Sequence, residues 1–162
     1  MSYQPVYGDY GVVGTTGVFG RLIQIGTLSR WNHAVIYIGN NEVVEATPKG
    51  VIVSPVTKYP KGTIAWNQHE GITPEERTAV VAEAHKLVGK PYDFFTILVL
   101  ALRILGIKLL SNMYALKRLA EKDGFICSEL VDHCYDVAGR TISDKPDYLT
   151  TPGDLAFRLI YQ

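Results

Sequence analysis

Two segments far apart in the chain carry the residue types of a thiol nucleophile and its base. His33 opens an apolar, strand-like run over residues 32–39, and Cys127 stands where the apolar run 125–131 turns into a helical pattern. A thiol becomes an effective nucleophile when its pKa is lowered or a base takes its proton, and a helix N-terminus with a nearby imidazole does both. The pair therefore indicates covalent catalysis by a cysteine hydrolase or acyltransferase.

A third residue can orient His33 only if the hairpin that follows it has the right register. With a two-residue turn at 40–41, Glu45 lies opposite Ile36 and points away from His33. With a three-residue turn that begins at Gly39, Glu45 shares the face of His33 as a diagonal neighbour, about 7–8 Å away between backbones. We choose the three-residue turn because it places a carboxylate where an imidazole needs one.

Each of these residues also has an interpretation without catalysis. A histidine at a strand start is often structural, a buried cysteine is often a small apolar side chain, and Glu45 could face solvent. His133 competes as the base, but it lies six positions after Cys127 on the same predicted helix. Their side chains therefore project roughly 120° apart, which makes contact awkward. We discount His69 and His85, which fall in a polar loop and on an exposed helix face.

Short β-branched and aromatic runs, separated by turns, predict a mostly antiparallel sheet. The expected strands cover residues 7–14, 33–38, 42–46, 50–54 and 63–66. A short helical piece is also expected at 18–28.

Two helices are predicted from their start and stop signals. Thr73, Pro74 and Glu76 form the sequence of a capping box with proline at the first helical position. The apolar face of this helix consists of Val80, Val81, Ala84, Leu87 and Val88. The helix is expected to end at Gly89 and Pro91. A last helix is expected from about Cys127 to Ala138.

The segment 94–110 is apolar but is interrupted by Arg103 and Lys108. Because a bilayer span takes about 20 apolar residues, a transmembrane helix is not expected. A buried or partner-facing helix is one interpretation, and a surface that contacts a membrane or an acyl chain is the other.

Composition narrows the function classes. A chain of 162 residues is most simply one domain, and its sixteen basic and sixteen acidic residues cancel, so no nucleic-acid partner is expected. Cys127 and Cys134 lie seven positions apart on one predicted helix, roughly 10 Å between Cα atoms, which is too far for a disulfide. No cysteine and histidine spacing is typical of zinc, so neither a metal nor a cofactor is expected. The N-terminus lacks the pattern of a secretory signal, which predicts a protein that stays in the cell or leaves by lysis or within a virion.

The order of motifs along the chain resembles the circularly permuted papain-like branch of the NlpC superfamily. That branch includes YiiX-like proteins and relatives of lecithin:retinol acyltransferase. The matching residues lie at 8–9, 32–39, 43–48, 89–93, 127–131 and 151–155. They span nearly the whole chain and keep the order of that family, with the histidine first and the cysteine last.

The resemblance implies roles for individual residues. Cys127 would be the nucleophile, His33 the general base and Glu45 the group that orients the imidazole. The step of twelve positions from His33 to Glu45 is similar to the spacing in the family. YiiX-like members have glutamate at this third position, whereas the lecithin:retinol relatives have histidine. Tyr92 is similar in placement to a tyrosine that lines the site in ordinary NlpC enzymes, as an oxyanion donor or as plain packing.

The implied fold is α+β: an antiparallel, barrel-like sheet packed against helices, in one permuted domain over 1–162 with an apolar helical insertion at about 94–122. The implied activity is that of a thiol peptidase or amidase that cleaves small peptides, with bacterial cell-wall (peptidoglycan) peptides as the favoured substrate. A lipid esterase, thioesterase or acyltransferase is the alternative that the 94–110 segment favours. A catalytically idle binding or virion-structural module is the third.

Overall fold

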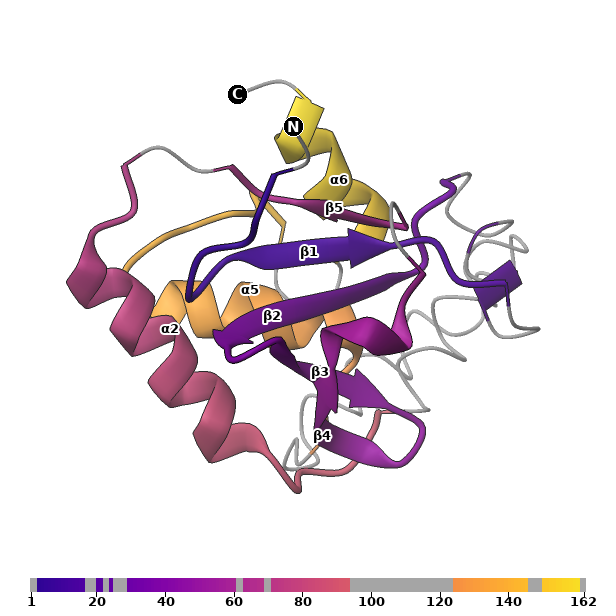
Figure 1. Ribbon diagram of the computed structural model, residues 1–162, viewed down its shortest axis with the longest axis horizontal. Helices are drawn as coiled ribbons and strands as arrows, with labels where there is room; N and C mark the ends of the chain where they lie inside the picture. The colour runs from indigo at the N-terminus through magenta and orange to yellow at the C-terminus, as the bar shows by residue number, and fades with distance from the viewer. Residues whose placement is uncertain are drawn as a thin grey trace, which may run out of the picture.

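The computed structural model describes residues 3–16, 20–21, 24, 29–60, 63–68, 71–93, 124–145 and 150–160, with the backbone alone at 157–160. Its elements are β1 (Tyr10–Val13), β2 (His33–Gly39), β3 (Glu42–Thr47), β4 (Gly50–Pro55), the 3-10 helix η1 (Val56–Lys58), β5 (Ile64–Trp66), α2 (Pro74–Leu87), α5 (Cys127–Val137) and α6 (Pro152–Ile160) (Figure 1). The fold is α+β, as predicted. The apolar segment 94–110 and the insertion at 94–122 lie outside the described residues, as does nearly all of 18–28.

The strands form one antiparallel sheet in the order β4-β3-β2-β1-β5. Alternate side chains of β1 to β4 face the main apolar core, which they share with α2, α5 and α6. In Figure 1, α5 crosses behind β2, and α2 runs alongside both. The opposite face carries a smaller apolar cluster around Val13, Val35 and Val43, with Tyr37 and Trp66 packed against it. The sheet is therefore buried on both faces near its centre.

The turn between β2 and β3 differs from the predicted one, but the register of the two strands is the predicted one. Residues 40–41 form a two-residue turn with φ of 51° and 59°, a conformation that asparagine tolerates, and Gly39 pairs with Glu42. A bulge just before the turn then shifts the pairing, so that Ile36 lies opposite Val44. The predicted three-residue turn is wrong. The bulge supplies the extra residue that this register needs.

Helix α2 starts as its capping box predicts. The backbone N–H of Glu76 donates to Thr73 Oγ1 at 3.2 Å, and the N–H of Thr73 donates to Glu76 Oε2 at 2.8 Å. Four of the five predicted apolar positions are buried, whereas Val88 is the C-cap residue and is 40% exposed. Gly89 then takes a φ of +91°, which ends the helix.

Helix α5 begins at Cys127 as predicted, and α6 is an element that the sequence reasoning missed. The signal for α6 was present: the N–H of Thr151 donates to Asp154 Oδ2 at 2.9 Å, and the N–H of Asp154 donates to Thr151 Oγ1 at 3.2 Å. Ser128 Oγ donates to the carbonyl of Thr150 at 2.6 Å, which ties the start of α5 to the residues before α6.

None of the helices among the described residues is both long and apolar enough to cross a membrane.

Candidate active site

His33 occupies the first position of β2, opposite Val13 of β1, with 15% of its side chain exposed. The preceding residue, Asn32, is buried and fixes this end of the sheet. Its Oδ1 accepts from the backbone N–H of Thr15 at 2.8 Å, and its Nδ2 donates to the Thr15 carbonyl at 2.7 Å. These two hydrogen bonds therefore fix the backbone next to the imidazole.

Glu45 meets His33 from the neighbouring strand β3. Its Oε2 lies 2.7 Å from His33 Nε2, and only 1% of its side chain is exposed. The same Oε2 accepts a hydrogen bond from the hydroxyl of Tyr59 at 2.5 Å, and Oε1 accepts one from Lys58 Nζ at 2.6 Å. Both oxygens of this buried carboxylate are thus engaged by donors.

The pKa of Glu45 reflects these donors. Burial alone would raise it, because a charged carboxylate loses its hydration. The hydrogen bond and charge of His33, together with the hydrogen bonds of Lys58 and Ser54, outweigh burial and hold the pKa of Glu45 well below the ordinary range. Glu45 is consequently a carboxylate across the physiological pH range.

Cys127 is the first residue of α5 and is 3% exposed. It lies beside the imidazole, since its hydrogen bond and its charge both act on the pKa of His33. Nε2 of the ring is already bound to Glu45, so Nδ1 is the nitrogen that remains for the sulfur. The helix N-terminus adds a partial positive charge at the same place.

The pKa of His33 is raised to about 9. Burial by itself would lower the pKa of an imidazole, but the negative charge of Cys127 and the carboxylate of Glu45 together outweigh it. At neutral pH the raised pKa keeps the His33 imidazole protonated, beside the carboxylate of Glu45.

Tyr92 completes the group of predicted residues that the structure brings together. It forms a parallel bridge with Phe125, just before the helix that presents Cys127. Burial, and then the negative charge of Cys127, raise the pKa of the Tyr92 hydroxyl, which keeps the phenol protonated. A neutral phenol beside the sulfur could donate a hydrogen bond to an oxyanion.

The competing residues lie elsewhere or are closed off. His133 Nε2 lies 3.6 Å from Glu83 Oε1, and the ring contacts that of Phe125, so its partners among the described residues are Glu83 and Phe125. His85 is exposed on α2, and His69 lies outside the described residues. Cys134 is fully buried, and the loss of hydration raises its pKa, which leaves it a poor nucleophile.

Lys58 and Tyr59 are members of the site that the sequence reasoning missed. After β4 the chain turns through η1 and returns toward β3, which brings both side chains onto Glu45. Neither residue belongs to a strand or a periodic pattern. No local signal in the sequence could therefore assign them to the site.

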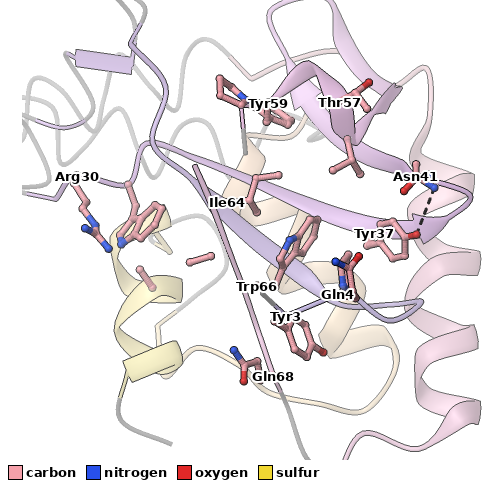
Figure 2. Close-up of a pocket in the computed structure, with 16 residues that line it drawn as sticks. Tyr3, Gln4, Arg30, Tyr37, Asn41, Thr57, Tyr59, Ile64, Trp66 and Gln68 are labelled. Atoms are coloured by element: carbon pink, nitrogen blue, oxygen red, sulfur yellow. Dashed lines mark hydrogen bonds between the residues drawn. The ribbon is translucent and has the colours of Figure 1, made fainter. Parts of the chain in front are cut away.

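A cavity of about 640 Å³ borders this cluster on the sheet face away from α2 and α5 (Figure 2). Its walls include Trp31, Tyr37, Tyr59 and Trp66, and Arg30 is the charged residue among the side chains that line it. Neither Cys127 nor His33 is among the residues that line it. Tyr59 is the residue that the cavity and the candidate site share.

Comparison with known proteins supports the fold. Neither a known family model nor a curated protein matches the sequence. Among solved structures, the crystal structure of the metalloprotein YiiX from Escherichia coli O157:H7 matches with a TM-score of 0.64 and 23% sequence identity, over 88% of this chain and 71% of that chain. The resemblance to YiiX-like proteins is confirmed at the level of the fold.

The donors around Glu45 do not fit a metal ion. Both carboxylate oxygens already accept hydrogen bonds, and an ammonium group 2.6 Å from Oε1 repels a second cation. Within the part of the chain that the structure describes, no group of three or more His, Cys, Asp or Glu residues could hold a metal ion. We therefore derive no chemical step through a metal.

Proposed function

We propose that this protein is a papain-like cysteine hydrolase that cleaves amide bonds in small peptides, with bacterial cell-wall peptides as the favoured substrate. The observation that carries the proposal is the 2.7 Å contact of His33 with Glu45, on an imidazole that also interacts with Cys127 at a helix N-terminus. The likeness to YiiX supports the fold part of the proposal. We extend it to a permuted papain-like topology over 1–162, with 94–122 as an apolar insertion.

The mechanism begins with the thiolate of Cys127 and the imidazolium of His33. The sulfur attacks the carbonyl carbon of the scissile amide, and the resulting oxyanion accepts hydrogen bonds from backbone N–H groups at the start of α5, with Tyr92 as a further donor. His33 gives its proton to the leaving amine as the C–N bond breaks, and an acyl-enzyme remains.

Water completes the reaction. The neutral imidazole of His33 takes a proton from a water molecule, whose oxygen attacks the thioester carbonyl. The C–S bond breaks, the carboxylic acid leaves, and the thiolate–imidazolium pair is restored. Glu45 holds the imidazole in the orientation and protonation state that both half-reactions need.

The lining of the neighbouring cavity is consistent with a peptide substrate. Aromatic rings form much of its wall, and a single guanidinium, that of Arg30, supplies charge. Such a surface suits apolar side chains and uncharged backbone better than a polyanion.

Covalent trapping tests the proposal. The protein is incubated with a peptide that carries a thiol-reactive electrophile, and the labelled residue is mapped by mass spectrometry. Labelling at Cys127 that depends on His33 is the expected result. Labelling at Cys134 alone, or none at either thiol, would overturn the assignment.

Substrate assays then separate the alternatives. Release of peptide fragments from purified cell walls supports the amidase, whereas release of fatty acid from lipid vesicles supports the esterase or acyltransferase that the 94–110 segment favours. A binding or virion-structural role would survive Cys127→Ala, so that variant decides whether the thiol matters at all.

A further inference from the structure

Glu45 is held by more donors than the orientation of one imidazole requires. The groups that face it come from several elements: His33 from β2, Ser54 from β4, Lys58 at the end of η1 and Tyr59 directly after η1. The charge of Cys127, at the start of α5, also acts on the hydroxyl of Tyr59.

The division of donors between the two carboxylate oxygens is informative. Tyr59 and His33 share Oε2, at 2.5 Å and 2.7 Å, whereas Lys58 binds Oε1 at 2.6 Å. A carboxylate anchored at both oxygens cannot rotate away from the ring that it faces. The Tyr59 ring also lies 6.2 Å from the His33 ring, so the tyrosine limits the position of both partners.

We infer that Lys58 and Tyr59 are positioning residues, which hold Glu45 so that Oε2 faces Nε2 of His33 and Nδ1 stays turned toward Cys127. The inference rests on the proposed function, because it concerns how the base of that reaction is oriented. Neither residue touches the reacting atoms.

Lys58 and Tyr59 lie in different surroundings, so the effects of removing each hydrogen bond to Glu45 can be measured separately. The ring of Tyr59 forms part of the cavity wall in Figure 2, while its hydroxyl is used by Glu45. The Lys58 side chain is 44% exposed, so its stem is not part of the core. Removal of the hydroxyl or the ammonium therefore leaves the packing of the sheet unchanged.

The variants are Tyr59→Phe and Lys58→Met, with Lys58→Arg as the conservative rescue. Each has a matched control elsewhere in the chain. Tyr3→Phe removes a tyrosine hydroxyl that donates to Asp9 Oδ2 at 2.7 Å, and Lys86→Met removes an ammonium 2.8 Å from Glu83 Oε2. The controls lose the same kinds of bond at carboxylates other than Glu45, and Tyr3, like Tyr59, lines the cavity in Figure 2.

Kinetics on the substrate that the cell-wall and lipid assays identify give the first readout. Tyr59→Phe should lower kcat about 10-fold with KM unchanged, since a hydrogen bond to a charged group is lost and substrate contacts are not. Lys58→Met should likewise lower kcat with KM unchanged, because the ammonium that anchors Oε1 of Glu45 is lost while substrate contacts are not. Lys58→Arg should restore kcat.

A readout that needs no activity keeps the inference separate from the proposed function. The Nε2 proton of His33 is followed by NMR, and its exchange with water should be at least about 10-fold faster in Tyr59→Phe and Lys58→Met than in the wild type. The inference is overturned if this exchange rate, like that of Tyr3→Phe and Lys86→Met, stays at the wild-type value. If the exchange rises but no substrate is ever cleaved, the positioning role stands and the hydrolase proposal fails.

Discussion

Two buried carboxylates in this protein have nearly the same donors and different consequences. Asp9 accepts from Arg77 Nη1 at 2.7 Å and from the hydroxyl of Tyr3 at 2.7 Å. Glu45 likewise accepts from a cationic side chain and from a tyrosine hydroxyl, but its third partner is an imidazole. The Asp9–Arg77 pair joins the turn before β1 to α2, and among the described residues the third partner of Asp9 is the backbone N–H of Val6 at 2.7 Å, which does not titrate.

The comparison shows that a buried ion pair is not by itself a sign of chemistry. Arginine stays charged across the accessible pH range, so the cluster around Asp9 can only fasten elements together. Histidine changes charge within that range, so the cluster around Glu45 can store and return a proton beside a thiol. The predictions below test this difference, beginning with the largest effect.

Glu45→Gln should lower kcat/KM for the proposed amide hydrolysis by up to about 10⁴-fold, the size seen when the carboxylate of a catalytic triad is made neutral. The reason is that an amide can hold the wrong tautomer of His33. Steady-state kinetics measure the effect, and Asp9→Asn is the control, with activity per folded molecule unchanged. An equal loss of activity in both variants would erase the distinction between the two clusters.

Asp9→Asn should instead cost about 3–5 kcal/mol in the free energy of unfolding, because it leaves a largely buried guanidinium without its counter-charge. The Arg77 side chain is 14% exposed, so water restores little of the lost interaction. Denaturant unfolding followed by circular dichroism gives the value. A loss below about 1 kcal/mol would contradict the structural role assigned to this pair.

His33 should titrate near pH 9 in the folded protein, and Cys127→Ala should lower that pKa, since the charge of Cys127 is the strongest of the influences that raise it. A folded-state pKa above the unfolded value of 6.5 stabilises the fold below about pH 6.5, and this contribution is lost as the pH rises through about 9. NMR titration of the imidazole follows the first effect, and unfolding measured across this pH window follows the second. An unchanged pKa in Cys127→Ala would mean that the sulfur and the ring do not interact.

Lys86→Met should change the free energy of unfolding by about 0.5 kcal/mol or less, because the Lys86 side chain is 70% exposed and its bond to Glu83 is screened by water. This surface pair sets the baseline against which both buried carboxylates are compared. Thermal and denaturant unfolding of the variant supply the number. A loss as large as that of Asp9→Asn would show that burial is not what separates the pairs.

Local patterns along the chain were sufficient for much of the fold. The capping box at Thr73 and the strand runs depend on contacts within a few residues, so their positions could be predicted closely. The register that places Glu45 on the face of His33 was also predicted, but for the wrong reason, since a bulge and a two-residue turn together produce it. Turn chemistry alone could not distinguish these routes, because asparagine suits both.

Residue types and local patterns along the chain identified the chemical groups of the candidate site: a cysteine at a helix start, a histidine at a strand start and a glutamate on the same sheet face. Packing between distant segments was needed to bring the start of α5 to the start of β2, and to bring Lys58 and Tyr59 back through η1 to the carboxylate. The difference lies in how far apart along the chain the contacting residues are. Secondary structure follows from neighbours along the chain, whereas these meetings depend on how the whole sheet packs against its helices.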